Sequence, residues 1–498
     1  MHPARRVLAV PTLAAVVTLL AGFGSSPVGP PAPTAPGTSK NIALIGHDAL
    51  MDRGMNAAPA LYHDSDSGRT YVYVGSRTDG SHPNAGVLIV DVTNPTKPAV
   101  VGQIGPPDEG LPSVTSRELR VWPQQKVLLV MNFNCSALLH GCVSPADVVG
   151  STTRNIDFYD ISDPANPTLV STYTPSRTPH EMFLWVDPTR PDTRALLWVS
   201  TPTSSLTAPN MIVTDISHWR DGTFPQLATW NGNQYFPPDE LSNDDVRVHS
   251  MDVSADGTRV YVAYLGGGLL ILDSSELATG AGTDLKLVST PQASPRWDNM
   301  TVHTAEKVPG RNLLLTTDEL YGDVLTPLEL NKFGCPWGWV HVVDISNPSQ
   351  PTVVGQFQTY ENTQTFCQTD AQPGSPNDEL TSYSAHNPTV LGPLAFVTWH
   401  SDGLQAIDIR NPTRPTQAGF FSPQPESVIV TEDPMLSMGG SKVVMWSYPI
   451  IYRGLIYLVD IRNGLYVLKY TGPLHQLVDH IWFLEGNSNL GDALQLGN

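Results

Sequence analysis

A strand-and-turn phrase that recurs along the chain constrains the fold more than any other feature. Each copy is an apolar, β-branched run that ends in Asp, and in four copies an Asn/Asp-Pro-x-x-Pro turn and a second apolar run follow. Proline sets such a turn and ends a strand. The run-ending residues recur about every 60 positions, which is the spacing of a repeat architecture. They are Asp91, Asp160, Asp215, Asp273, Asp344 and Asp408, and a seventh run, 464–470, has Lys469 in this place.

Two further strands are expected before each phrase, which makes four strands in every repeat. They are clearest in residues 249–263, where Ala255-Asp256-Gly257 predicts a hairpin turn. Seven four-stranded repeats predict an all-β fold, the seven-bladed β-propeller, in which radial packing covers the sheet faces and leaves only short edges. The content of 45 Pro and 40 Gly disfavours long helices and agrees with this class. One structural Asp per blade fits a turn role better than a catalytic role.

The seventh repeat lacks an outer strand, because no fourth-strand run follows residue 470. Residues 41–47, near the N-terminus, have the fourth-strand pattern of residues 352–356. We therefore predict that the N-terminal strand completes the last blade. The propeller then spans residues 41–470, and residues 471–498 form a C-terminal tail packed partly through Trp482 and Phe483.

The N-terminus has the organisation of a secretory signal. A basic pair, Arg5-Arg6, precedes an apolar run over 7–22 and a small-x-small site, Gly22-Phe23-Gly24. The run is shorter than the roughly 20 residues that span a membrane. We predict a signal peptide at 1–24, a Pro/Gly/Ser-rich linker at 25–40 and a secreted protein without membrane insertion. The net charge of −19 disfavours a nucleic-acid partner.

Four cysteines fit the oxidising compartment that export implies. Cys135 and Cys142 flank a short segment and are expected to close a local loop. Cys335 and Cys367 would then form the second disulfide, which is the preferred one of three possible pairings. The second bridge would tether two long connections over the propeller axis.

The Leu-Val-Ile-Val-Asp type of strand followed by Asn-Pro-x-x-Pro resembles the LVIVD-repeat family of exported bacterial β-propellers over about residues 41–470. The resemblance implies a fold and no single activity. More distantly, the chain is similar to the selenium-binding protein and methanethiol oxidase propellers, which carry a histidine-rich metal centre. The paired-histidine motifs of that group are absent from this sequence, so no residue is carried over.

Four repeats place histidine at the start of the innermost strand, where residues converge on the axis: His180, His249, His303 and His386. Arg117 occupies this slot in the second repeat and Ser447 in the seventh. Imidazole suits Zn, Cu, Fe or Ni, so the four histidines predict a metal centre. The alternative is a structural latch or a proton-sharing histidine cluster, in which the rings bond to neighbouring blades.

Further candidates are expected on the same face at the ends of second strands. Glu319, beside Asp318, and His400 in the next blade are candidate catalytic residues together with Arg117. A carboxylate there could orient ligating imidazoles. Glu181 follows a predicted ligand, but strand alternation is expected to turn it away from the axis.

Two classes of function are consistent with these residues. The first is an exported metal-dependent enzyme, with copper or iron at the four histidines performing oxidoreductase chemistry on a small molecule; zinc and a hydrolase such as a lactonase form a variant of it. The second is a non-catalytic propeller that binds a protein or glycan. Phosphate loops, dinucleotide fingerprints and nucleophile elbows are absent from the sequence. Substrate and oligomeric state stay open at this point.

Overall fold

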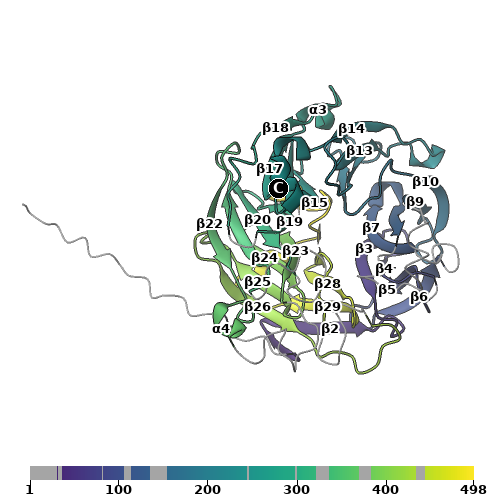
Figure 1. The fold of residues 1–498 in the computed structure, drawn as a ribbon. Helices are drawn as coiled ribbons and strands as arrows, with labels where there is room; N and C mark the ends of the chain where they lie inside the picture. Colours follow the sequence, from purple (N-terminus) through teal and green to yellow (C-terminus); the bar gives the residue numbers. More distant parts are fainter. Residues whose placement is uncertain are drawn as a thin grey trace, which may run out of the picture. The chain divides into compact units, whose positions relative to one another are not determined.

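The repeated phrase folds into antiparallel sheets in the computed structural model of the protein (Figure 1). The structure describes residues 31, 36–80, 82–105, 114–134, 154–243, 246–297, 300–320, 336–368, 383–432 and 443–497, which all belong to one compact unit, Pro31–Asn498. Its longest described helix, α2 (Pro238–Asn243), has 6 residues. No helix within the described residues is long and apolar enough to cross a membrane. The predicted all-β class is confirmed.

The strands pair in chain order as groups of four, each running from an innermost to an outer strand. The first three groups are β3 (Asn56–Asp64), β4 (Arg69–Ser76), β5 (Val87–Asp91) and β6 (Ala99–Ile104); β7 (Val114–Trp122), β8 (Val127–Asn134), β9 (Arg154–Asp160) and β10 (Thr168–Tyr173); and β11 (Met182–Val186), β12 (Ala195–Ser200), β13 (Met211–Asp215) and β14 (Gln226–Trp230).

The next three groups follow the same pattern. They are β15 (Val246–Val253), β16 (Arg259–Leu265), β17 (Leu269–Asp273) and β18 (Lys286–Leu287); β19 (Val302–Lys307), β20 (Leu313–Asp318), β21 (Val340–Asp344) and β22 (Thr352–Phe357); and β23 (Ala385–Val390), β24 (Leu394–Trp399), β25 (Gly403–Asp408) and β26 (Thr416–Ser422). The last group is β27 (Ile450–Tyr452), β28 (Leu455–Asp460), β29 (Gly464–Tyr470) and the N-terminal strand β2 (Ile42–Asp48). Short helices α3 (Ser275–Thr279), α4 (Gln364–Cys367), α5 (His475–Asp479) and α6 (Ala493–Leu496) lie in connections or near the C-terminus.

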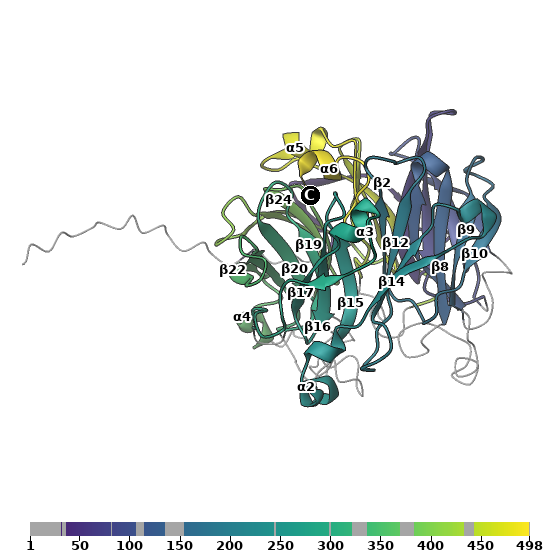
Figure 2. The same cartoon turned by 90° about the horizontal axis from the view of Figure 1, so that it is seen from above.

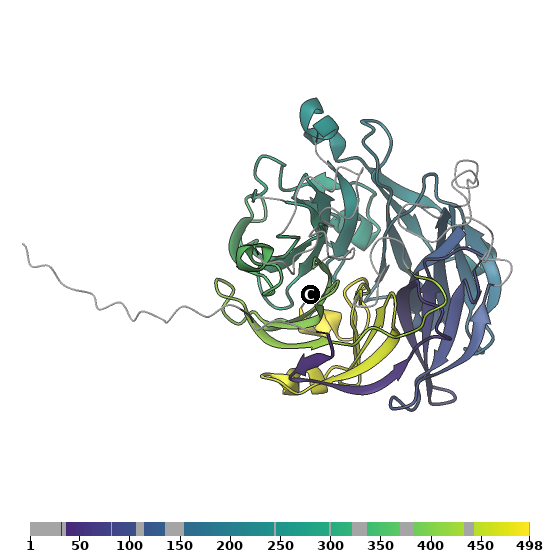
Figure 3. The same ribbon diagram turned by 60° about the horizontal axis from the view of Figure 1, so that its bottom comes forward.

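The N-terminal strand shares a sheet with the end of the chain. β2 pairs with β29 antiparallel, with Ile42 opposite Tyr470, and Figure 3 shows the purple strand beside the yellow ones. This is the pairing that the fourth-strand pattern predicts. The segment predicted as a linker differs from the prediction at its end, because β1 (Thr38–Lys40) pairs with β26. These residues can pair because β26 otherwise forms an open edge, and an open edge accepts a further strand.

The six repeated Asp residues have one structural role. In each, the side-chain Oδ1 accepts the backbone N–H of the residue two positions on, at 2.7–3.0 Å, as in the pair Asp344 and Ser346. An Asx turn of this kind ends the strand and starts the connection. The predicted turn role of the Asp residues is confirmed.

The core consists of layers between neighbouring sheets. Seven apolar clusters each join two consecutive groups of strands. One of the seven joins the last group to the first through Val459 and Val72. The innermost strands also touch in chain order, and β28 contacts β3. Since each sheet buries both faces in this way, the groups form a β-propeller.

The C-terminal segment crosses between the innermost strands instead of lying outside them. After β30 (Phe483–Leu484) pairs with β27, Ser488 bridges Leu184 in β11 and the Asn489 side chain bonds the backbone of Val186 and Ala255. Figure 2 shows α5 and α6 at the end of the strands opposite to α2. Of the two residues predicted to pack this tail, Phe483 packs against two core clusters, whereas Trp482 is 51% exposed and contacts Tyr452 with its ring. Residues 484–490, which the prediction did not name, are buried. Backbone and amide hydrogen bonds hold the segment, and hydropathy does not reveal them.

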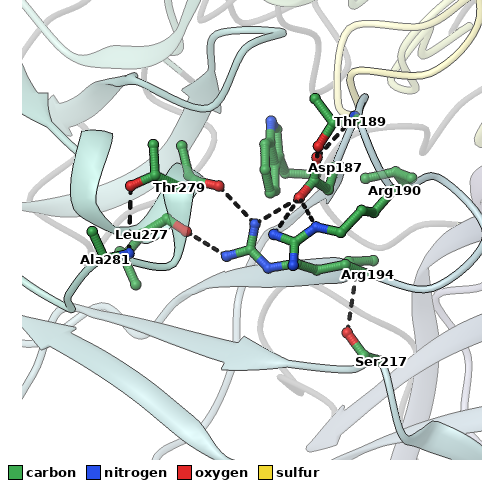
Figure 4. A network of polar contacts seen from close by, with 12 residues as sticks. Asp187, Thr189, Arg190, Arg194, Ser217, Leu277, Thr279 and Ala281 are labelled. Carbon is green, nitrogen blue, oxygen red and sulfur yellow. Dashed lines mark hydrogen bonds and ion pairs between the residues drawn. The ribbon is translucent and has the colours of Figure 1, made fainter.

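A polar network ties the third group to the fourth (Figure 4). Asp187, after β11, accepts hydrogen bonds from Thr189, Arg190 and Arg194 at 2.7–3.0 Å. Arg194 also donates to the carbonyl of Ala278 at the end of α3, 2.7 Å away. The carboxylate therefore fixes a guanidinium that spans two neighbouring sheets.

Candidate metal centre

The four predicted histidines lie together at one end of the innermost strands. His180 lies two residues before β11, and the other three lie in β15, β19 and β23. His249 is centred 4.5 Å from the His180 ring and 3.9 Å from the His303 ring, and His303 is centred 4.1 Å from His386. The strand starts of four successive sheets thus place imidazoles in one row.

Glu319 and His400 extend this row and are buried within it. One carboxylate oxygen of Glu319, Oε1, lies 3.2 Å from His386 Nε2 and 3.3 Å from His400 Nε2. The other oxygen, Oε2, lies 3.7 Å from His303 Nε2. Glu319 follows β20 and His400 follows β24, so second strands of two neighbouring groups complete what the innermost strands begin.

The hydrogen bonds of two rings determine which nitrogen faces the carboxylate. His386 Nδ1 donates to the Trp446 carbonyl at 2.6 Å. His303 Nδ1 lies 2.7 Å from the Thr304 hydroxyl, which itself donates to Asn387 and so accepts from the ring. With Nδ1 protonated, the Nε2 atom of each neutral ring carries a lone pair directed at Glu319. Within the described residues, neither Nε2 atom has a hydrogen-bond partner.

Burial keeps four of the imidazoles neutral. It lowers the pKa of His249 to about 3 and that of His400 to about 4, and it holds the pKa of His180 and His303 well below the usual range. Burial acts to raise the pKa of Glu319, but charge attraction to His386 and His303 and hydrogen bonding with His386 and His400 hold it well below its usual value. Metal ions bind to an ionised carboxylate and to imidazoles in their neutral form.

The distances fit ligands of a shared cation. Two ligands bonded at about 2.0–2.2 Å and 90–110° lie roughly 3–3.5 Å from each other. The separations of 3.2 Å and 3.3 Å from Glu319 Oε1 to two Nε2 atoms fall in this interval. Without a cation, lone pairs of the imidazoles would face carboxylate oxygens in a buried site, which is unfavourable.

The other predicted neighbours lie at the His180 end of the row. Arg117, in β7, is buried, and its positive charge contributes to lowering the pKa of His180 and His249. The expectation that Glu181 turns away was wrong, because a ligand atom of Glu181 lies within 4.8 Å of those of His180 and His249. Strand alternation does not apply to Glu181, since β11 begins only at Met182.

Sequence reasoning missed Trp446, which packs against the site from the seventh group. Its ring lies 4.0 Å from the His386 ring and stacks on His400 at 5.3 Å and 7°. Arg77 lies over its other side, 4.3 Å from the ring centre. The sequence offered one indication of Trp446: it directly precedes Ser447, which aligns with the histidines of the other repeats.

Asp318 serves a separate, structural cluster beside the site. Its carboxylate accepts hydrogen bonds from Trp297 Nε1 and from the backbone of Thr301, both at 2.8 Å, and lies 3.1 Å from His341 Nδ1. His341 is buried between Trp297 and Trp339. These contacts hold the connection before β19 against β21.

Three of the four cysteines predicted to form disulfides lie outside the described residues. Cys135, Cys142 and Cys335 lie outside the described residues, as do the signal peptide at 1–24 and most of the linker. Cys367 ends α4. The pairing of the four cysteines stays a prediction.

Comparison with known proteins finds the repeat along the chain. The LVIVD repeat matches residues 70–104, 156–175, 249–279, 337–359 and 384–422. Solved structures similar to this chain include the Myceliophteria thermophila Cps50 (Swd1) β-propeller domain, with a TM-score of 0.44, 10% identity and coverage of 84% of this chain and 97% of that one. A chain of a mitotic checkpoint complex matches with a TM-score of 0.44, 10% identity and coverage of 89% and 98%. No curated protein matches the chain. The chain thus carries LVIVD repeats in five segments that are spread over the strand groups of its β-propeller.

Proposed function

We propose that this protein is an exported metal-dependent oxidoreductase whose copper or iron is bound by the buried histidines and Glu319. One observation carries the proposal. The Nδ1 atoms of His303 and His386 are fixed by hydrogen bonds, so that both Nε2 lone pairs face a buried carboxylate. A metal-ligating histidine is oriented in this way by a partner on its other nitrogen.

The donor set favours a transition metal. Imidazole nitrogens with a single carboxylate suit copper, iron and zinc better than calcium or magnesium, which prefer oxygen. Copper or iron would supply electron transfer when bound. Zinc in the same ligands would support a hydrolase instead, so the identity of the metal separates the two activities.

The chain's own residues would control access and protonation. His180 is partly exposed, whereas His303, His386 and His400 are fully buried, so a small-molecule substrate would approach from the His180 end. Burial, helped by the positive charge of Arg117, keeps His180 and His249 unprotonated and available as ligands or acceptors. In this proposal Glu319 and His400 act as ligands, and Arg117 as a positioning residue.

Metal analysis tests the proposal directly. The protein, purified without a His tag, would be measured by elemental mass spectrometry as isolated and after reconstitution with Cu²⁺ or Fe²⁺. We expect bound copper or iron in the wild type and its loss in His303→Ala/His386→Ala. His218→Ala, which changes an exposed histidine, is the matched control and should retain the metal.

Each other outcome changes the assignment. Zinc as the bound metal would replace the oxidoreductase with a hydrolase. No metal after reconstitution would reject the enzyme and favour a propeller that binds a protein or glycan. Export is proposed from the N-terminal sequence, and N-terminal sequencing of the mature protein tests it: removal of about residues 1–24 is expected, and an intact Met1 would contradict it.

A further inference from the structure

We propose that the centre holds two metal ions bridged by the Glu319 carboxylate. One ion would bind Oε1 with His386 and His400, and the other would bind Oε2 with His303 and His249. The inference rests on the proposed function, because it assumes that the cluster binds metal, and it changes the predicted four-histidine site for one ion into a site with two.

The two carboxylate oxygens face different histidines. Oε1 has two Nε2 neighbours, at 3.2 Å and 3.3 Å, which belong to His386 and His400. Oε2 has a different one, His303 Nε2, at 3.7 Å, below the about 4.2 Å that separates two ligands on opposite sides of one ion. A carboxylate that offers one oxygen to each of two ligand sets has the arrangement of a bridging ligand.

The ligand atoms divide into two sets that share only Glu319. His249, His303 and Glu319 form one set with all ligand atoms within 4.8 Å of one another, and Glu319, His386 and His400 form another. Among the described residues, no such set contains both His303 and His386, although their rings are 4.1 Å apart. The ligand atoms therefore favour two ions, one for each set, over a single ion shared by all of these residues.

His180 fits a supporting role better than a ligand role. Its Nε2 lies 2.8 Å from His249 Nε2, a hydrogen-bond distance, and shorter than the roughly 3–3.5 Å expected for two ligands of one ion. His180 contacts Nε2 of His249, so the other nitrogen, Nδ1, stays available to an ion. His180 then orients His249 as Trp446 orients His386.

The burial of His386 and His400 favours a second ion. His386 and His400 have 0% exposure, and a lone ion on His249 and His303 would leave these two buried imidazoles beside Glu319 Oε1 with no ion to bind. A second cation would bind these two rings and the shared carboxylate. Metal pairs of this kind are typically about 3.5–4 Å apart and hold a substrate or reactant between them.

Titration of the metal-free protein with Cu²⁺ tests the inference. After removal of unbound metal, two copper ions per chain are expected, with an electron paramagnetic resonance intensity below that of two isolated ions because the bridged ions couple. His386→Ala/His400→Ala should bind one copper at full intensity, and so should His249→Ala/His303→Ala. His218→Ala should keep two.

X-ray absorption of the wild type gives a second measurement that needs no buried substitution. A copper–copper distance of about 3.5–4 Å is expected. One copper per chain without this distance would overturn the two-ion inference and leave the proposed function standing. No bound copper, iron or zinc in the wild type would overturn both. Two copper ions in the His386→Ala/His400→Ala protein would overturn the assignment of the ligands.

Discussion

The Nδ1 atom of His386 donates to the backbone carbonyl oxygen of Trp446 at 2.6 Å, and this one bond directs the opposite nitrogen of the ring at Glu319. The carbonyl belongs to the last group of strands, whereas the ring belongs to the group before it. Packing of neighbouring groups of strands therefore determines which nitrogen of His386 faces Glu319. A backbone acceptor cannot be removed by substitution, but the Thr304 hydroxyl, which accepts from His303 in the same way, can.

Thr304→Val removes the hydroxyl that accepts from His303 Nδ1. Loss of an oxygen that orients a ligand typically weakens metal binding about 10- to 100-fold, and we expect a loss of this size for Cu²⁺. Competition with a chelator of known affinity measures it. The matched control is Thr316→Val in β20, whose buried hydroxyl has no hydrogen-bond partner among the described residues. Equal affinity of the two variants would contradict the orienting role of Thr304.

Asp187→Asn should reveal a pH-dependent contribution to stability. Burial acts to raise the pKa of Asp187, but hydrogen bonds from Thr189, Arg194 and Arg190 lower it to about 2. A lowered folded-state pKa stabilises the fold above the unfolded value of about 3.9, and this contribution is lost as pH falls toward 2. We expect the wild type to exceed the variant by about 2 kcal/mol in unfolding free energy at pH 7.

Chemical denaturation at pH 7, 4 and 3 measures this difference. Titration of the wild-type carboxylate removes about 1 kcal/mol of the advantage by pH 3, with little change between pH 7 and 5. A difference that stays constant from pH 7 to pH 3 would show that the ion pairs of Asp187 do not stabilise the fold.

Gly257→Ala tests the hairpin of the fourth group. Gly257 has a φ of +77°, and a Cβ atom there would lie 2.5 Å from the Trp185 ring. The backbone conformation costs a non-glycine residue about 1–2 kcal/mol, and forced overpacking typically adds about 1–3 kcal/mol. Gly68→Ala is the matched control, since it has a φ of +69° with nothing within 4 Å of the new atom. Thermal unfolding should show the larger loss at Gly257, and equal losses would exclude the contact with Trp185.

Asn489→Ala tests whether the C-terminal segment stabilises the propeller. The side chain bonds the N–H and carbonyl of Val186 and the carbonyl of Ala255, at 2.7–3.0 Å. Its loss leaves buried backbone groups without partners, and a cost of about 2–4 kcal/mol is expected. Gln476→Ala, at an exposed side chain, should change the unfolding temperature little. An unchanged unfolding temperature for Asn489→Ala would mean that the segment is dispensable.

The sequence predicts the fold far better than the site. Strand runs, Asp-ended turns and the β2 pattern are periodic, and periodicity reports on local backbone structure. The histidine row is also visible, because a residue repeated at one slot of a repeat must recur at one place in the fold. The bridging geometry of Glu319 is not visible, since it depends on where a side chain after β20 meets the rings of β19 and β23.

Three parts of the structure depend on contacts without a local signature. Trp446 acts through its carbonyl oxygen, which every residue type possesses. Glu181 lies before its strand and thus escapes alternation. Asn489 holds its segment through backbone partners about 300 and 230 positions away, and no sequence pattern specifies such partners.

The pairing of β2 with β29 also sets an order of events during synthesis. His47 bonds the carbonyl of Asn463, 416 residues later, so one of the first strands to leave the ribosome must wait for almost the last. Until then the nascent chain carries an unpaired apolar strand at one end and an incomplete sheet at the other. Closing so long a loop is slow because chain entropy opposes it. The N-terminal strand therefore stays unpaired for the longest time, and the last group of strands forms only after β29 has been synthesised.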